Sequence, residues 1–177
     1  MLNLNLPLQQ INKFDVALCI FCNRQSRHLF VRRLFLVVSR LGDGVFWYTL
    51  MAALLLIYRF DALLAVLHML TAALVGTVIY KLIKCKTLRP RPFNVYPAII
   101  CTGKTLDQFS FPSGHTMHAV SFSLIVIFYF PALIWLVLPF TVLVALSRPI
   151  LGLHYPSDVL AGIGLGTTLA VASFQFV

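Results

Sequence analysis

The sequence predicts an all-α integral membrane protein, a helical bundle of five to six transmembrane helices in a single domain over residues 1–177. Of the 177 residues, 60% are hydrophobic and 11% are charged, and the mean hydropathy is +0.91. A soluble domain of this length could not cover so much apolar surface with polar side chains. Apolar segments recur along the chain, and each is long enough, or nearly so, to cross a hydrocarbon core of about 30 Å.

Five segments are candidate spans. They run over residues 44–60, 62–83, 115–130, 132–150 and 156–175. Because consecutive spans alternate in direction, we expect the loop at residues 84–113 and the segment at residues 147–158 to emerge on one face of the membrane. In the last span, Gly162 and Gly166 have the G-x-x-x-G spacing that lets membrane helices pack closely.

The first 43 residues are more polar than the rest of the chain. The stretch "FDVALCIFC" is too short to span a bilayer, and "RHLFVRRLFLVVSRLGDG" mixes apolar positions with Arg32, Arg33 and Arg40. This pattern is typical of an amphipathic helix in the membrane interface, with cationic side chains that reach the headgroups. We therefore expect interfacial or imperfectly spanning helices over residues 1–43.

The charge and the cysteines limit the classes of partner. A net charge of +9 suits anionic lipid headgroups or a phosphorylated substrate. Nucleic acid is not expected, because the cations are scattered between apolar spans and form no stripe. No histidine completes a zinc site with the C-x-x-C pair. We expect no metal or other cofactor, and we expect the four cysteines to be buried apolar side chains: Cys19, Cys22, Cys85 and Cys101.

Two polar clusters surround the loop at residues 84–113. The stretch "KCKTLRPRP" at residues 84–92 carries four cations directly after a span, which either set the topology of the protein or bind an anion. In "FPSGHT", the amides of Ser113, Gly114 and His115 lie at the positive end of a helix dipole. Either this helix start forms an anion site, or Ser113 only caps the helix and His115 lies at the lipid interface.

The third cluster, "SRPILGLHYPSD", joins the last two spans. Arg148 lies near the end of one span, His154 in the turn and Asp158 in the first turn of the next span. Asp158 either caps that helix or accepts a hydrogen bond from one ring nitrogen of His154. The second arrangement would leave the other nitrogen free as a nucleophile.

Together, the three clusters predict phosphoryl transfer at one membrane face. Placing ionisable groups in or near a membrane costs free energy, so such groups indicate a functional site. Two histidines, several cations, an orienting aspartate and a helix N-terminus are the groups that this reaction needs, and Lys and Arg can neutralise the phosphate oxygens without a metal.

The same residues resemble a known family. The patterns Lys84-x6-Arg91-Pro92, Pro112-Ser113-Gly114-His115 and Ser147-Arg148-x5-His154-x3-Asp158 are similar to the three-part signature of the type 2 phosphatidic acid phosphatase (PAP2) superfamily of membrane lipid phosphatases. The resemblance implies that His154 attacks phosphorus to form a phosphohistidine, that Asp158 holds His154, and that His115 is the general acid. It also implies the phosphate-binding set: Lys84, Arg91, Ser113, Gly114 and Arg148. His118 is outside the signature, and we expect it to serve helix packing.

The resemblance implies a lipid phosphate as substrate, in a multi-pass protein of the bacterial inner membrane with its active site on the periplasmic or outer face. Undecaprenyl diphosphate is favoured over phosphatidylglycerophosphate, phosphatidate and lipid A 1-phosphate. Two alternatives stay open: a phosphotransferase that passes the phosphate to an acceptor lipid, and a non-catalytic lipid-binding membrane protein. The sequence leaves the oligomeric state open.

Overall fold

The computed structural model describes residues 5–105 and 107–176, and helices dominate this part of the chain. The all-α prediction is therefore confirmed. The α-helices are α1 (Asn5–Arg24), α2 (Leu29–Arg40), α3 (Phe46–Tyr58), α4 (Leu63–Thr87), α5 (Pro92–Val95), α6 (Gly114–Tyr129), α7 (Ile134–Ile150) and α8 (Pro156–Ser173).

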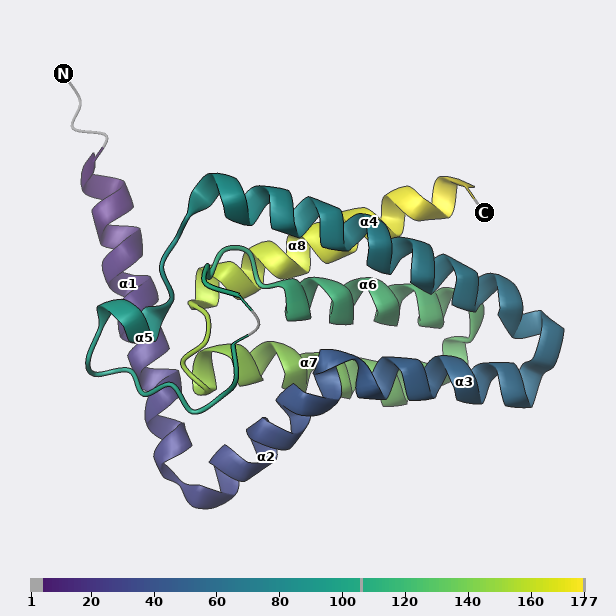
Figure 1. Cartoon of the computed structure of the whole chain (residues 1–177), viewed down its shortest axis with the longest axis horizontal. Helices are drawn as coiled ribbons and strands as arrows, with labels where there is room; N and C mark the ends of the chain where they lie inside the picture. The colour runs from purple at the N-terminus through teal and green to yellow at the C-terminus, as the bar shows by residue number, and fades with distance from the viewer. Residues whose placement is uncertain (1–4, 106, 177) are drawn as a thin grey trace.

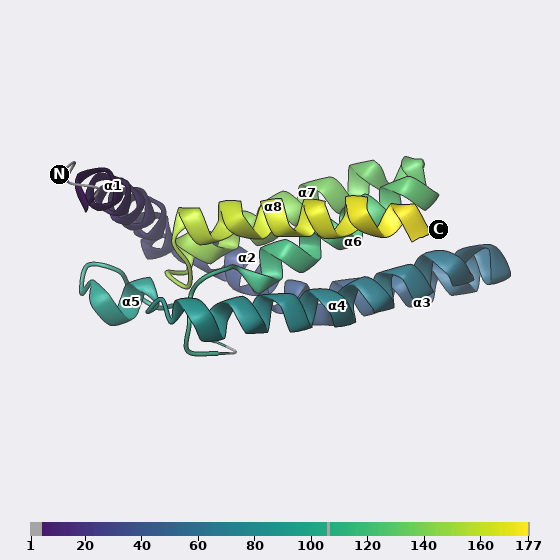
Figure 2. The ribbon, with the colours of Figure 1, turned by 90° about the horizontal axis from the view of Figure 1, so that it is seen from above.

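The long helices of the described chain form a bundle of two layers around α6. Figure 2 shows α3 and α4 on one side and α7 and α8 on the other, with α6 between them. Helix α6 contacts α4, α7 and α8. The site described below lies at the end of the bundle that α1 crosses (Figure 1).

Each predicted span corresponds to one helix of the bundle, with small differences at the ends. The largest difference is in α4, which continues to Thr87, so that Lys84 is on a buried part of a helix and not in a loop. Helices that are long and apolar enough to cross a membrane lie in Leu29–Thr87, Pro131–Ile150 and Pro156–Phe176, and Gly114–Tyr129 is a shorter apolar helix. These features indicate several membrane crossings.

Large apolar side chains cover the outside of the bundle. Leu56 on α3, Phe60 in the α3–α4 turn and Trp135 on α7 are 81%, 87% and 86% exposed. Apolar exposure of this extent marks a surface that meets something other than water. Lipid is the surrounding that fits these helices.

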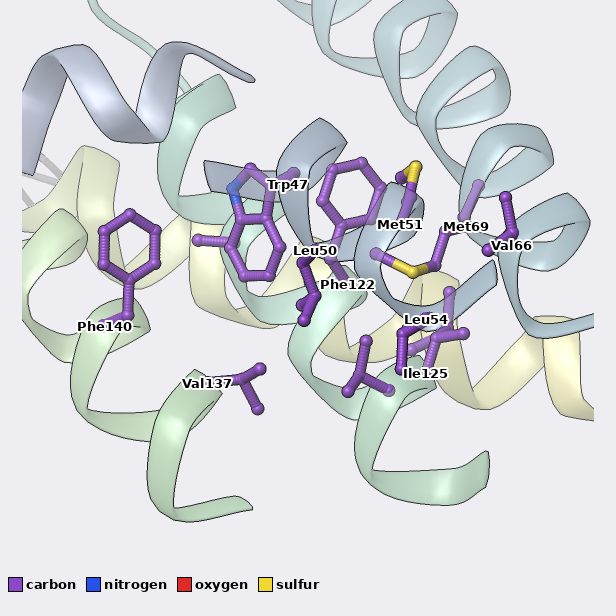
Figure 3. Close-up of a cluster of buried hydrophobic side chains, with 14 of the residues drawn as sticks. Trp47, Leu50, Met51, Leu54, Val66, Met69, Phe122, Ile125, Val137 and Phe140 are labelled. Carbon is purple, nitrogen blue, oxygen red and sulfur yellow. The ribbon is translucent and has the colours of Figure 1, made fainter. Parts of the chain in front are cut away.

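The core joins α3, α6 and α7 through aromatic side chains (Figure 3). Trp47 on α3 is 2% exposed, and its ring centroid lies 5.2 Å from that of Phe122 on α6 and 5.6 Å from that of Phe140 on α7. Helices that meet in lipid are held by close van der Waals packing, which these rings supply. The tilted ring pairs fix how these helices meet.

The N-terminal region forms two helices outside the bundle. Helix α1 has 20 residues, so "FDVALCIFC" is the second half of a longer helix than the sequence predicts. Helix α2 packs against α7 and buries Phe35 and Val38, whereas Arg32, Arg33 and Arg40 are exposed. The amphipathic pattern is thus confirmed, and its position in the membrane interface stays a prediction.

The expectation for the cysteines is wrong in part. Cys19 is buried and Cys22 is partly buried, but Cys85 and Cys101 are exposed. Cys85 follows the buried Lys84 on the last turn of α4, so it faces outward, and Cys101 lies in the loop before α6.

The two glycines of the G-x-x-x-G pattern lie where α8 crosses α6. A Cβ atom added to Gly162 would lie 2.7 Å from the carbonyl oxygen of Ser113, and one added to Gly166 would lie 2.5 Å from that of Met117. A Cβ atom on Gly164 would meet nothing within 4 Å. The pattern therefore serves close helix packing, as predicted.

We expect the substitution Gly162→Ala to lower the free energy of unfolding by about 1–3 kcal/mol, because the added methyl group forces α8 away from α6. Gly164→Ala is the matched control. Its methyl group points into open space, so only the better helix propensity of alanine acts, by up to about 1 kcal/mol in the stabilising direction. Thermal unfolding of the purified variants in detergent measures both effects, and equal loss in the two variants would contradict this packing.

Candidate active site

The three polar clusters meet at one end of the bundle, where α4 and α7 end and α6 and α8 begin. Nη1 of Arg91 donates to the carbonyl oxygen of Leu153 over 2.8 Å, and the amide of Ser113 donates to the carbonyl oxygen of Asp158 over 3.0 Å. The expectation that residues 84–113 and 147–158 share one face is therefore confirmed. A cavity of about 240 Å³ lies beside them; its lining includes Lys84, Arg91, Gly114, His115 and His154.

His154 is held in the tight turn between α7 and α8. The amides of Leu153 and His154 both donate to the carbonyl oxygen of Arg148, over 2.9 and 3.4 Å. Nε2 of His154 lies 3.4 Å from Nη1 of Arg91, and Nδ1 lies 3.5 Å from Oδ2 of Asp158. Burial lowers the pKa of His154 to about 4, although the carboxylate of Asp158 acts in the opposite direction. The ring is therefore neutral at pH 7, as a nucleophile must be.

Asp158 fills one of the two roles that the sequence left open. Its Oδ2 accepts a hydrogen bond of 2.9 Å from the amide of Tyr155 and so caps α8. The same oxygen is the one that faces Nδ1 of His154. The hydrogen bond of Asp158 to His154 stays a prediction, because Nδ1 of His154 has no hydrogen-bond partner among the described residues. Oδ1 of Asp158 accepts from Arg89 over 2.7 Å, so a cation compensates this buried charge.

Lys84 and Arg91 share one carboxylate. Nζ of Lys84 lies 2.8 and 2.7 Å from the two carboxylate oxygens of Asp107, and Nη2 of Arg91 donates to Oδ1 over 2.8 Å. Burial alone would raise the pKa of Asp107, but the hydrogen bond and charge of Lys84, followed by the charge of Arg91, hold it below its usual value. The two cations that the sequence assigns to phosphate thus pair with a carboxylate of the protein itself, that of Asp107.

The remaining predicted phosphate ligands differ in whether their side chains already have hydrogen-bond partners. Arg148 is 1% exposed; its Nε donates to Ser147, and its buried Nη2 has no hydrogen-bond partner among the described residues. A buried donor without a partner is costly, which favours an incoming anion. The Oγ of Ser113, in contrast, pairs with Thr116, and Gly114 lines the cavity. The roles of Ser113 and Gly114 as phosphate ligands stay predictions.

His115 and His118 both line the cavity from α6. Nε2 of His115 lies 2.5 Å from Oδ1 of Asp43, a residue that the sequence reasoning missed. His118 stacks on Phe122, and its Nε2 lies 3.3 Å from Oγ1 of Thr77. His118 therefore packs as expected, but it also forms part of the cavity wall.

Helix α1 contributes a second missed residue, Asp15. Its Oδ2 accepts from Nη2 of Arg89 over 2.7 Å, and its Oδ1 accepts from the amide of Ser157 over 2.9 Å. Arg89 thereby bridges Asp15 and Asp158, and those charges raise its pKa against the effect of burial. The N-terminal helix is thus tied to the carboxylate behind His154.

Comparison with known proteins decides the family. Residues 62–177 match the PAP2 superfamily. The chain belongs to this superfamily. The resemblance found in the sequence is therefore confirmed, and the match covers the whole of the region that holds the three motifs.

Several PAP2 relatives are phosphatases of polyprenyl lipids by name. The chain is 40% identical over 99 residues to the decaprenylphosphoryl-5-phosphoribose phosphatase of Mycobacterium tuberculosis, which covers 55% of this chain and 52% of that protein. It is 29% identical over 144 residues to the undecaprenyl-diphosphatase of Sulfolobus acidocaldarius, covering 80% of this chain and 68% of that protein. The chain thus spans about half the length of the mycobacterial relative.

Two solved structures have the same fold. A transmembrane PAP2-type phosphatidylglycerolphosphate phosphatase from Bacillus subtilis is 26% identical with a TM-score of 0.68, covering 94% of this chain and 86% of that chain. Aquifex aeolicus LpxE, at 23% identity, shares the fold with a TM-score of 0.72, covering 90% of this chain and 93% of that chain. The protein is a multi-pass membrane protein.

Proposed function

We propose that the protein is a lipid phosphatase that removes phosphate from a polyprenyl-linked phosphate, undecaprenyl diphosphate before others, through a phosphohistidine. The cavity carries this proposal. Its lining combines His115, His154, Lys84 and Arg91 with apolar side chains such as Trp47, Met51, Leu70 and Phe122. A phosphate bound by the histidines and cations would leave the first carbon atoms of a lipid against these apolar side chains.

The choice of lipid rests on the relatives. The proteins from M. tuberculosis and S. acidocaldarius, and the undecaprenyl-diphosphatase BcrC of B. subtilis at 32% identity over 57% of its length, are all named for polyprenyl lipids. These names support a polyprenyl substrate. Phosphatidylglycerophosphate is the second candidate, because a structural neighbour at 26% identity carries that name.

The first proposed step forms the phosphoenzyme. Nε2 of neutral His154 attacks phosphorus, the P–N bond forms, and the P–O bond to the lipid breaks. His115 gives its proton to the departing oxygen, while Lys84, Arg91 and Arg148 neutralise the remaining phosphate oxygens. Asp158 stabilises the positive charge that develops on His154.

The second proposed step regenerates the enzyme. Water attacks phosphorus, its proton passes to His115, and the P–N bond breaks to release phosphate. If an acceptor lipid takes the place of water, the protein is a phosphotransferase, which is the alternative that the sequence left open.

Phosphate release by the purified full chain in detergent tests the proposal. The assay contains EDTA and compares undecaprenyl diphosphate, decaprenylphosphoryl-5-phosphoribose, phosphatidylglycerophosphate, phosphatidate and lipid A 1-phosphate. We expect release without added metal, fastest from a polyprenyl lipid. Metal-dependent release, or no release from any lipid, would overturn the proposal, and phosphate that appears only on an added acceptor lipid would favour transfer.

We propose that the site faces the periplasm. Several cations at this end of the bundle form ion pairs within the site. They therefore do not indicate a cytoplasmic face, as positive charges in a loop otherwise do. The exposed Cys101 lies in the loop of the site. Its labelling by an impermeant thiol reagent in spheroplasts, absent in Cys101→Ser, is the expected result, and protection of Cys101 would place the site in the cytoplasm.

A further inference from the structure

His115 lies where a positive charge is disfavoured. It is in the first turn of α6, at the positive end of the helix dipole, and the cationic side chains of Arg148 and Lys84 act on it. A general acid must nevertheless hold a proton before the lipid departs. The surroundings of His115 must therefore include a group that favours the imidazolium.

Asp43 is brought to His115 by an unusual segment. The chain kinks at Leu41–Val45 between α2 and α3. Gly44 in this kink has φ of 136°, which is strained for any residue with a side chain. A Cβ atom on Gly42 would lie 3.0 Å from the side chain of Val144 on α7. The glycines thus let this segment lie close to α7, with Asp43 facing the cavity.

The two histidine–aspartate pairs of the site differ in a way that matches their tasks. Asp158 shares its charge with Arg89 and stays 3.5 Å from His154. Asp43 has no salt-bridge partner other than His115 within residues 5–105 and 107–176, and the two atoms are 2.5 Å apart. Asp43 therefore acts on His115 at shorter range and with no competing salt bridge among the described residues, whereas Asp158 also compensates the charge of Arg89.

We infer that Asp43 is a positioning residue for the reaction, which keeps His115 in its protonated form and orients the ring. Nε2–H of the imidazolium donates to Asp43, and Nδ1, which makes no hydrogen bond to the described residues, carries the proton for the leaving oxygen. This role rests on the proposed function. Asp43 lies outside the matched residues 62–177, so the family signature does not assign it.

A different role for Asp43 would be that of a placeholder, a carboxylate that occupies the phosphate site until the substrate displaces it. The two roles predict opposite kinetics. Loss of a placeholder would lower KM and leave kcat unchanged, because the phosphate would meet less competition. Loss of a proton-holding partner would lower kcat and change its pH dependence.

The test is the isosteric variant Asp43→Asn, with Asp61→Asn in the exposed α3–α4 turn as the matched control. We expect Asp43→Asn to lower kcat at pH 7 about 10-fold or more and to move the alkaline limb of the pH profile to lower pH. The other charged or titratable groups that line the cavity or act on His115 are unchanged in both variants: Tyr48, Tyr80, Lys84, Arg91, Asp107, His118, Arg148 and His154.

Two further measurements separate this inference from the proposed function. In the His115→Ala background, Asp43→Asn should not lower kcat any further, because Asp43 acts through the ring of His115. Histidine NMR, with the His115 signal assigned by its loss in His115→Ala, should show the ring deprotonating at lower pH in Asp43→Asn whether or not a lipid substrate is found. An unchanged NMR titration, or a lower KM with unchanged kcat, would overturn the role of Asp43; an inactive wild type with a shifted titration would overturn the proposed function alone.

Discussion

The substitution His154→Ala is expected to reduce phosphate release by at least about 10³-fold, because it removes the atom that we propose as the nucleophile. Lys84 and Arg91, which line the same cavity, are held by Asp107 and so cannot take its place as nucleophile. His28→Ala, on an exposed side chain outside the cavity, is the matched control and should leave the rate unchanged. Steady-state kcat/KM on the best lipid substrate measures both variants.

The pH profile follows from the neutral state of His154. A free imidazole loses its nucleophilic form as the pH falls through about 6.5, but burial lowers the pKa of His154 to about 4. The acid limb of kcat/KM should therefore lie well below pH 6.5. An acid limb near 6.5, or radiolabelled phosphate trapped by alkaline quenching on His154→Ala, would contradict the assignment of the nucleophile.

The helices could be predicted because apolar runs report them directly. All five spans were located to within a few residues, since turn residues such as Pro131 interrupt a long apolar pattern. The end of α4 could not be predicted, because a lysine such as Lys84 normally marks the end of an apolar span. Within the fold its charge is compensated by Asp107. Helix α1 is longer than the stretch "FDVALCIFC" because it also includes the polar residues up to Lys13, which carry no apolar pattern.

The signature residues were found from their spacing, but their partners were not. Asp15, Asp43 and Asp107 lie 74, 72 and 16 or 23 positions away from the cations or histidine that they contact, and no local pattern encodes such pairs. One signal was present in the composition. The chain has only five acidic residues, and in so apolar a chain each carboxylate needs a partner; four of the five, Asp15, Asp43, Asp107 and Asp158, take part in the network at the site.

The substitution His115→Ala is expected to slow the reaction by about 10²- to 10⁴-fold, with a loss that depends on the leaving group. A departing alkoxide needs a proton, so the loss should be largest for an alkyl phosphate such as phosphatidate. A departing lipid phosphate, as from undecaprenyl diphosphate, is more stable as an anion, so the loss of rate should be smaller. A p-nitrophenyl leaving group needs almost no proton, so the loss of rate should be smallest.

The matched control for this series is Lys84→Ala, because Lys84 faces the same cavity but is assigned to the phosphate and not to the leaving group. Its loss in kcat/KM should be similar for all three leaving groups, since each substrate presents the same phosphate oxygens. A graded loss in His115→Ala beside a uniform loss in Lys84→Ala would assign the proton to His115. Uniform loss in both variants would mean that His115 only helps to bind the phosphate, and Asp43 would then have no proton to hold in place.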